Sequence, residues 1–451
     1  MALVEDLLAL VENVSASAIR SRLSTLSRAS LFLLLAAAAP AAGLETATSD
    51  MRSADDAGLS PRELLGKRIF EDKRLSEPAG VACASCHDPS NAFQGNNGSP
   101  IAALARGSRP DALGTRKTPS LAYVSFSPRF HFMKKKDEET GETKRIPVGG
   151  QFWDGRADDL AAQVEGPLLN PREMNNPSKA AVVEKIKTGA YAELARRVYG
   201  DRIFESDSAF ERLARAVAAY ESSERFHPFS SKFDDFLRGR ERLTPQEAQG
   251  LALFKDKKKG NCIACHVGEE TSRRPQDWLF TDFSYDALGA PRNFAIPDNK
   301  DPAHIDLGLC KRDGLAKAAP EGFDVESLCG QFKAPTLRNI AVTGPYLHNG
   351  VFTTLRDVVA FYATRDTDPS RWYPKENGAT AKYDDLPEKL HGNVNVEEVP
   401  YDRKRGEAPR LDDAEIDAIV AFLRTLTDRA FSQGRQIAPP PPRKGHERRA
   451  G

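Results

Sequence analysis

The sequence is poor in cysteine and methionine and carries no excess charge. Its 451 residues include only six cysteines and four methionines, and no methionine follows Met174. Lysine plus arginine balance aspartate plus glutamate at 64 each, so the formal net charge is zero. A thioether ligand from the second half of the chain is therefore excluded, and the charge gives no indication of a nucleic-acid partner. After about residue 42 no apolar run is long enough to cross a bilayer.

Four of the six cysteines fall in two copies of Cys-x-x-Cys-His. This pattern is the attachment signature of a c-type haem, in which the thiols add to the vinyl groups and the histidine becomes the proximal iron ligand. A zinc site or a thioredoxin-like dithiol also uses Cys-x-x-Cys, but neither requires a histidine after both pairs. We therefore predict two covalently bound c-type haems, and hence redox chemistry, at Cys83, Cys86 and His87 and at Cys262, Cys265 and His266.

The first 42 residues are typical of a secretory signal peptide. Arg20, Arg22 and Arg28 precede an apolar run at residues 31–39, which small residues follow. The run is short for a membrane span, so we expect cleavage and a periplasmic protein. Because the basic residues lie far from Met1, a downstream start or a retained anchor stays open. Export agrees with the two haems, since bacteria attach haem covalently outside the cytoplasm.

The remaining two cysteines, Cys310 and Cys329, favour a disulfide, because an exported chain folds in an oxidising compartment. Two buried thiols are the alternative. Only geometry can separate the two.

Each half of the sequence repeats the same order of signals. Residues 60–63 and 244–247 each place a serine or threonine N-cap before a proline, with a glutamate third in the helix. A glycine, an apolar pair and the Cys-x-x-Cys-His motif follow. Each half then closes with an amphipathic helix, at residues 210–222 and 414–426. We predict a mainly α fold of two tandem cytochrome c-like domains with long irregular loops.

The repeat also places the domain boundaries. We expect the N-terminal domain at residues 43–235 and the C-terminal domain at 236–430, with a polar joining stretch at 226–242. The charged stretch at 134–145 predicts a solvated loop. Four consecutive prolines and then basic residues predict an extended, disordered tail at 431–451.

Segments beside the two motifs resemble those of the bacterial dihaem cytochrome c peroxidases. Phe-Trp-Asp-Gly-Arg at 152–156, followed by Gln163 and Glu173, resembles the segment that links the two haems in this family. Pro-Thr-Leu-Arg-Asn at 335–339 and Thr-Gly-Pro-Tyr-Leu-His-Asn-Gly at 343–350 resemble the matching segment of the second half. The motifs occur in the family's order and cover most of the chain.

The resemblance implies that the first haem reacts with hydrogen peroxide. Glu173 would carry the proton between the peroxide oxygens, since burial raises the pKa of a carboxyl toward the useful range. Gln163 would orient the peroxide, and Trp153 would relay electrons between the haems. By itself Glu173 is also typical of a helix-start acid, and a lone tryptophan usually packs in a core.

The axial ligands of the first haem depart from the ordinary peroxidases of this family. Those proteins carry a histidine in the loop after the first haem motif, whereas this chain has none between His87 and Phe130. His131 fits a surface or half-buried group better than an iron ligand. We therefore expect the first haem to be five-coordinate.

Tyr362 stands at the family's ligand position for the second haem. This feature resembles MauG, a dihaem enzyme that oxidises tryptophans on another protein. A phenolate ligand stabilises ferric and higher iron and lowers the potential. The alternative is a core aromatic on a helix at 355–362.

The family also holds a calcium ion between its domains. The resemblance assigns two backbone carbonyl ligands to Thr343 and Pro345, but Lys117 stands where the family has an asparagine ligand. An ammonium cannot ligate calcium and could replace its charge instead, which puts the ion in doubt. The resemblance further implies that Arg338 pairs with a haem propionate and that His348 bonds near the second haem.

Three functions fit these residues. The first is a MauG-like dihaem peroxidase that oxidises a protein substrate, which the missing loop histidine and Tyr362 favour. The second is a peroxidase that removes hydrogen peroxide with electrons from a small cytochrome or cupredoxin. The third is a dihaem electron carrier without catalysis, which needs no distal carboxylate such as Glu173.

Overall fold

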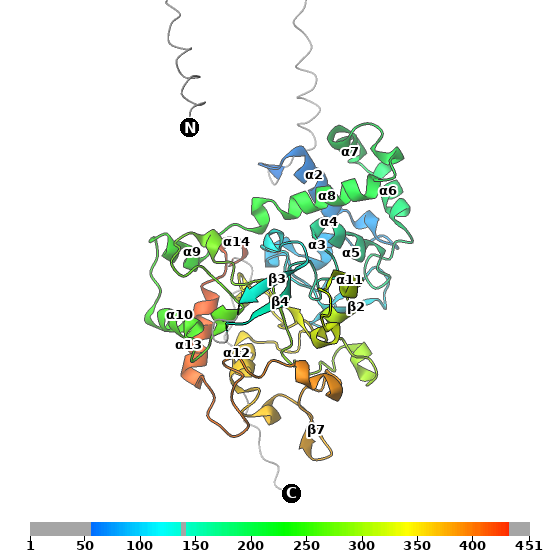
Figure 1. Cartoon of the computed structure of the whole chain (residues 1–451). Helices are drawn as coiled ribbons and strands as arrows, with labels where there is room; N and C mark the ends of the chain where they lie inside the picture. Colours follow the sequence, from blue (N-terminus) through cyan, green and yellow to red (C-terminus); the bar gives the residue numbers. More distant parts are fainter. Residues whose placement is uncertain (1–55, 137–140, 433–451) are drawn as a thin grey trace, which may run out of the picture. The chain divides into compact units, whose positions relative to one another are not determined.

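The computed structural model describes residues 56–136 and 141–432 (Figure 1), and two of its long helices begin with the predicted caps. Before α2 (Pro61–Glu71), Ser60 Oγ accepts from the Glu63 backbone and the Glu63 carboxylate accepts from the Ser60 backbone N–H. Before α10 (Pro245–Lys255), Thr244 and Glu247 make the same reciprocal pair of bonds. Each box satisfies two of the free N–H groups of a helix start.

The closing helix of each half crosses its capped helix at a glycine. Helix α8 (Ala209–Glu221) crosses α2 at Gly66, where a β-carbon would overlap the backbone oxygen of Ala216. Helix α13 (Asp413–Arg424) crosses α10 at Gly250, where a β-carbon would overlap the backbone oxygen of Ala418. Figure 1 shows both helix pairs side by side, and the two halves therefore repeat one close backbone crossing.

The other helices are short and separated by long irregular connections. The helices predicted at 210–222, 355–362 and 414–426 are present within two residues of the expected bounds. Besides α2, α8, α10 and α13, the described α-helices are α3 (Cys83–Cys86), α4 (Leu160–Gln163), α5 (Glu165–Leu169), α6 (Lys179–Lys187), α7 (Ala192–Tyr199), α9 (Lys232–Leu237), α11 (Leu315–Ala318), α12 (Leu355–Thr364) and α14 (Arg429–Ser432).

The described strands form four two-stranded antiparallel pairs. They are β1 (Leu104–Arg106) with β2 (Leu113–Lys117), β3 (His131–Lys136) with β4 (Thr143–Val148), β5 (Tyr285–Asp286) with β6 (Phe332–Lys333), and β7 (Lys375–Glu376) with β8 (Ala379–Thr380).

The described residues of the charged stretch at 134–145 are exposed, as predicted, but the predicted loop is wrong, because the stretch lies in the β3–β4 hairpin. Lys134 pairs with Arg145 in register, and residues 137–140 at the turn lie outside the described part. The base of the hairpin anchors it: Val148 is buried, and the Phe132 ring packs edge-on against Phe323 at 5.1 Å. The charged residues of the stretch suggested a loop, although the apolar residues Phe132 and Val148 flank it.

Matching aromatic clusters form the core of each half. In the first half Phe70 packs against Phe226, whose ring stacks on Phe93 at 3.8 Å between centroids. In the second half Phe254 packs edge-on against Phe280 at 5.9 Å and Phe422 at 5.3 Å. Each capped helix thus contributes one phenylalanine to an aromatic cluster next to its Cys-x-x-Cys-His motif.

The predicted domain boundary at 235/236 falls inside α9. The joining stretch at 226–242 is not simply polar, because Phe233 on α9 is fully buried and its backbone N–H donates to the Thr425 carbonyl at 3.0 Å. From Leu59 onward the described residues form one compact unit, and residues 56–58 before it form a short turn. The division into two domains stays a prediction.

Both predicted terminal segments lie almost wholly outside the described residues. This holds for the signal peptide at 1–42 and for the tail at 431–451, of which only Phe431 and Ser432 are described, as the end of α14. Among the described helices, none is both long and apolar enough to span a bilayer.

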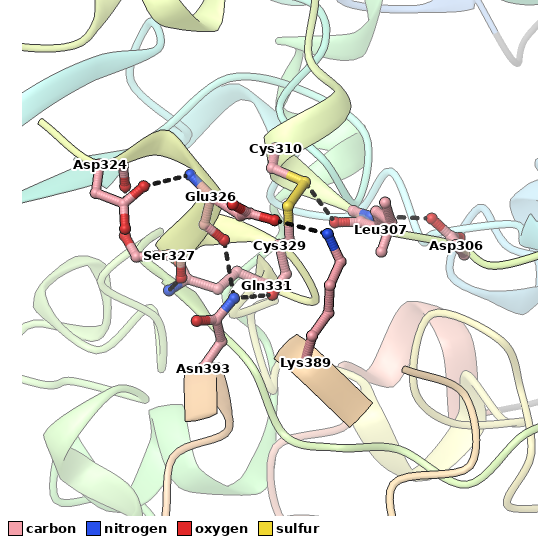
Figure 2. The surroundings of a disulfide bond; sticks show 11 residues. Asp306, Leu307, Cys310, Asp324, Glu326, Ser327, Cys329, Gln331, Lys389 and Asn393 are labelled. Carbon is pink, nitrogen blue, oxygen red and sulfur yellow. Dashed lines mark hydrogen bonds and ion pairs between the residues drawn. A yellow bond between two sulfur atoms is a disulfide. The ribbon is translucent and has the colours of Figure 1, made fainter. Parts of the chain in front are cut away.

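The predicted disulfide between Cys310 and Cys329 is confirmed. The sulfurs are 2.14 Å apart and the α-carbons 4.8 Å apart. Figure 2 shows Asn393 beside the bridge, where its amide donates to the carbonyls of Cys329 at 3.1 Å and Glu326 at 2.8 Å. The bridge closes the loop that holds α11, and Lys389 pairs with Glu326 on the same side.

Candidate haem sites

Each Cys-x-x-Cys-His motif lies in the wall of its own cavity. Helix α3 supplies Cys83 and Cys86 to the first cavity, and a 3-10 turn η7 (Cys262–Ala264) begins the motif of the second. All four thiols are free. Within the described part of the chain, no group of three or more His, Cys, Asp or Glu side chains is arranged so that it could hold a metal ion. This donor set does not fit zinc, which takes four such ligands.

The two motif histidines are held in the same way. Nδ1 of His87 lies 3.0 Å from the Phe93 carbonyl, and Nδ1 of His266 lies 3.0 Å from the Phe280 carbonyl. Each bond fixes the tautomer and leaves Nε2 available to a metal. Burial lowers the pKa of both imidazoles, that of His87 to about 4, so both are neutral as iron ligation requires.

The motif thiols are neutral groups in apolar surroundings. Burial raises the pKa of Cys86 and of Cys262 to about 12 and also raises that of Cys83 and Cys265. A redox dithiol instead has a lowered thiol pKa in an electropositive site. Together with the histidine geometry, both sites fit covalently attached haem better than a dithiol.

Glu173 lies in the wall of the first cavity with Gln163. One carboxylate oxygen of Glu173 accepts from the Asn170 amide at 2.7 Å. Burial raises the pKa of Glu173, and the Asn170 bond and the charge of Arg156 oppose that rise. Gln163 is the last residue of α4, which Asp159 caps at its start. The predicted acid and amide therefore face one cavity.

Trp153 lies between the two cavities and lines both. Its indole N–H donates to the Lys117 carbonyl at 2.8 Å, and its own carbonyl accepts from the Lys333 backbone at 2.8 Å. We call the residues that line both cavities the shared wall: Lys117, Pro119, Ser120, Trp153, Lys333, Ala334, Pro335 and Thr336.

The shared wall contains one buried lysine, Lys117, and one partly buried lysine, Lys333. Burial lowers the pKa of Lys117 and of Lys333 to about 7, although the charge of Asp154 raises that of Lys333. Lys333 Nζ donates to the Gly150 carbonyl at 2.5 Å. The Lys117 ammonium lies 5.9 Å from the centre of the Trp153 ring. Both amines thus carry only part of a positive charge near neutral pH.

Arg116, next to Lys117 of the shared wall, forms ion pairs with residues of both halves of the chain. Arg116 pairs with Asp154 at 2.5 Å and with Asp306 at 2.6 Å. Its guanidinium also lies 5.5 Å from the Phe332 ring, which stacks on His348 at 3.5 Å between centroids. These contacts fix the position of His348.

Tyr362 on α12 lines the second cavity. Its ring packs against the ring of Tyr401 at 5.6 Å, and Tyr401 lines the same cavity. Burial raises the pKa of both phenols, followed for Tyr362 by the charge of Asp286. A phenolate at this position would therefore depend on a cation such as ferric iron.

His348 and Arg338 are placed differently. His348 lines the second cavity, and burial lowers its pKa to about 4. Arg338 also lines that cavity, but it is fully buried and forms a bidentate pair with Asp234 at 2.9 and 3.1 Å. Its remaining donors bond to Trp278, Pro275 and Tyr123. Pairing of Arg338 with a propionate stays a prediction that would require one of these bonds to be given up.

Of the residues that the resemblance assigns to calcium, Thr343 lines the second cavity, as Lys117 does, and Pro345 follows Thr343 by two residues. Calcium binding stays a prediction. His131 is exposed on β3, and its ring nitrogen lies 2.8 Å from the Arg129 carbonyl. Among the described residues that line the first cavity, His87 is the one histidine.

Sequence reasoning missed three side chains of these cavities. Lys333 and Tyr401 carry no motif, and their burial comes from contacts between distant segments. Glu221 ends a predicted amphipathic helix, on which a terminal acid normally faces water. Its spacing, one turn after Val217 and two turns after Leu213 on the apolar face, was the available signal for Glu221.

Residues 60–242 match the di-haem cytochrome c peroxidase family. The chain is also 37% identical over 402 residues to the methylamine utilization protein MauG of Paracoccus denitrificans, covering 88% of this chain and 94% of that one. The chain belongs to the di-haem cytochrome c peroxidase family. It is therefore an oxidoreductase of the dihaem peroxidase class, whose members carry two haems.

Other similar proteins include two named peroxidases and a MauG-like protein. The cytochrome c551 peroxidase of Nitrosomonas europaea is 29% identical, covering 65% of this chain and 70% of that one. The solved structure of the diheme peroxidase BthA from Burkholderia thailandensis superposes with a TM-score of 0.75 at 44% identity, covering 83% of this chain and 90% of that one. A MauG-like protein associated with microbial copper homeostasis shares the fold, with a TM-score of 0.57 at 22% identity over 85% and 95% of the two chains.

Proposed function

We propose that this dihaem peroxidase reduces hydrogen peroxide at the first cavity and oxidises a protein substrate through the second. The supporting observation is that Glu173, Gln163 and His87 line one cavity while Tyr362 and His266 line the other. Reduction of one peroxide to two waters consumes two protons and two electrons. Haem bound at the motif cysteines supplies the iron for that redox step.

Glu173 handles the proton in this scheme. The raised pKa of Glu173 suits a group that takes a proton from the inner peroxide oxygen and returns it to the outer one. The bond from Asn170 holds the carboxyl in one orientation. Gln163 provides an amide donor and acceptor on the same wall, which would hold peroxide close to Glu173.

Trp153 connects the two cavities electronically. Because it lines both and is fixed by bonds at its indole and its backbone, it offers an aromatic step between them. Tyr362 would ligate the second iron as a phenolate, which favours storage of oxidising equivalents over electron donation. These features favour slow oxidation of a protein partner.

The second candidate is peroxide removal with a small cytochrome or cupredoxin as the electron donor. Its support is the similarity to cytochrome c551 peroxidases. Rapid steady turnover with reduced cytochrome c would favour this function. Slow turnover with loss of tryptophan fluorescence from a partner protein would favour protein oxidation. In either case we propose a periplasmic enzyme with covalent haems.

Electron paramagnetic resonance of the ferric protein tests the proposal. We expect one high-spin and one low-spin haem, with both signals changing after peroxide is added. Tyr362→Phe should alter the low-spin signal, while Tyr401→Phe, its neighbour in the same cavity, should leave the ligation unchanged. Two low-spin haems that do not react with peroxide would instead support an electron carrier.

A substitution of Met174 tests whether the first haem has a sixth ligand from the protein. Met174 is buried and lines the first cavity, follows Glu173 in sequence, and carries a thioether sulfur, which is a known haem-iron ligand. Met174→Leu should leave the high-spin signal unchanged. A low-spin signal that becomes high-spin in this variant would contradict a five-coordinate first haem.

A further inference from the structure

Glu221 is a buried acid that the proposed peroxide chemistry does not use. It is the last residue of α8, only 3% exposed, and it lines the first cavity with Val217 and Cys83. Its Oε2 has no hydrogen-bond partner among the described residues. A buried carboxylate without a partner is costly, so Glu221 requires an explanation.

The position of Glu221 on its helix adds a second cost for the charged form. The C-terminal end of a helix carries partial negative charge, which repels a carboxylate and attracts a cation. No basic residue lies in the last turn of α8. Burial raises the pKa of Glu221 to about 8.

The basic residues on the elements packed against α8 interact with groups other than Glu221. Helix α4 carries no charged residue, and the 3-10 turn Ile203–Glu205 carries only the acid Glu205. On α2 and α6, Lys67 and Arg68 pair with Glu71, Lys179 with Glu165, Lys185 with Glu77 and Lys187 with Glu184, and the charge of Arg62 acts on Tyr199. Glu221 therefore has no counter-ion on these neighbours.

The first cavity contains the remaining groups that could influence Glu221. Cys83 lines the same cavity, and its pKa is raised by burial and then by the charge of Glu221; the charge of Glu173 raises the pKa of both Cys83 and Cys86. His87 and Tyr123 line the cavity as well, as do the basic residues Arg106, Arg116, Lys117, Arg156, Arg172 and Lys333. None of these appears among the causes of the raised Glu221 pKa, which is burial.

We propose that Glu221 is a redox-linked proton site of the haem in the first cavity. Reduction of ferric iron adds one negative charge to the cavity, and the Glu221 carboxylate then binds one proton from solvent. Oxidation releases that proton. The electron comes from the donor that supplies the peroxidase reaction, so one electron and one proton enter together and the charge of the site is unchanged.

The direction of the effect follows from electrostatics. Ferric haem is one unit more positive than ferrous haem, so it favours the carboxylate and gives Glu221 the lower of its two pKa values. Between those two values the midpoint potential falls as pH rises, toward one proton per electron. Below and above this window the potential is constant. The inference rests on the family's haem at this site and not on the roles of Glu173 or Trp153.

Spectroelectrochemical titration of the holoprotein from about pH 6 to pH 10 tests it, with the second haem as internal reference. We expect the first-haem potential to fall with pH in the native protein and to become pH-independent in Glu221→Gln, while Glu173→Gln keeps the slope. A second variant, Glu221→Leu, replaces the polar group entirely and should behave like Glu221→Gln.

Infrared difference spectra of oxidised and reduced protein give an independent readout. The native protein should show a protonated-carboxyl band on reduction that Glu221→Gln lacks. A pH-independent native potential, a slope that survives Glu221→Gln, or one that Glu173→Gln removes would overturn the proposal. Peroxide reactivity is measured alongside, because its absence with an intact pH slope contradicts the proposed peroxidase function alone.

Discussion

At the scale of single residues, environment separates side chains of the same type into different roles. Glu173 and Glu221 both line the first cavity, yet Asn170 holds Glu173 while Glu221 Oε2 has no partner among the described residues. Glu165 lies on the neighbouring α5, half-exposed and paired with Lys179 at 2.8 Å. Three glutamates in one region therefore differ in burial and in partners, and burial raises the pKa of Glu173 and of Glu221.

Glu173→Gln should slow the reaction with peroxide by about 10²–10⁴-fold, because the amide cannot shuttle a proton. Haem content and the ferric spectra should not change. Stopped-flow absorbance after peroxide addition measures the rate. Glu165→Gln is the matched control and should react at the native rate. An unchanged rate in Glu173→Gln would remove the proposed proton carrier.

Calcium removal is the second prediction at this scale. The resemblance aligns Lys117 with the family's asparagine ligand, and an ammonium cannot ligate calcium. We expect dialysis against a calcium chelator to leave both haem spectra and the peroxide reaction unchanged. Loss of the reaction, with recovery on adding calcium, would show that the ion is bound despite Lys117.

At the scale of elements, the repeated helix crossing determines how each cavity is closed. Gly66 and Gly250 let α8 and α13 approach the backbones of α2 and α10. The same helices carry residues of the cavities, such as Glu221 on α8 and Ile419 on α13. A displacement of either closing helix would therefore move a cavity wall.

Gly66→Ala and Gly250→Ala should each destabilise the protein by at least about 1–3 kcal/mol, since the added carbon overlaps a backbone oxygen that cannot rotate away. Denaturant unfolding of the holoprotein measures this. Gly392→Ala is the control, because nothing lies within 4 Å of a β-carbon there. Its effect should stay within about 0.5 kcal/mol. Similar losses of unfolding free energy in all three variants would mean that the helix pairs can move apart to accommodate the added carbon.

Local signals predicted the elements better than the contacts between them. The capping boxes at Ser60 and Thr244 are encoded within four residues each, and both formed as expected. The β3–β4 hairpin was missed because its anchor depends on Phe323, almost two hundred residues away in sequence. Burial of Phe233 on α9 likewise comes from α13, through Phe422.

The candidate sites follow the same division. The Cys-x-x-Cys-His motifs and the resemblance of Trp153 and Glu173 to family positions are contiguous in sequence, so they could be recognised. Two other features could not be recognised from the sequence: the unpartnered Oε2 of Glu221 and the ion pair of Arg338 with Asp234. Both depend on which distant groups fold against these side chains. Residue type alone does not determine these partners.

At the scale of the whole molecule, the shared wall joins the two cavities. Its residues come from three separate segments, around Lys117, Trp153 and Lys333. The Trp153 indole N–H donates to the Lys117 carbonyl, and the Trp153 carbonyl accepts from the Lys333 backbone N–H. A change in this wall therefore touches both sites.

Trp153→Phe should leave both resting haem spectra nearly unchanged, while the spectral change of the second haem after peroxide addition slows by at least about tenfold. Phenylalanine keeps most of the packing but is harder to oxidise and loses the bond to the Lys117 carbonyl. Rapid-mixing absorbance and freeze-quench paramagnetic resonance follow the two haems separately. Trp278→Phe, in the core of the second half, is the control. An unaltered rate would place the electron path elsewhere.

The indole bond of Trp153 has a consequence for what passes between the two halves. An amide oxygen is a hydrogen-bond acceptor but a very weak base, so the Lys117 carbonyl can hold the indole hydrogen without removing it. An indole oxidised in this position would stay a cation instead of becoming a neutral radical. Only electrons, and no protons, would then cross the shared wall at Trp153. Each cavity would have to exchange its protons with groups on its own side.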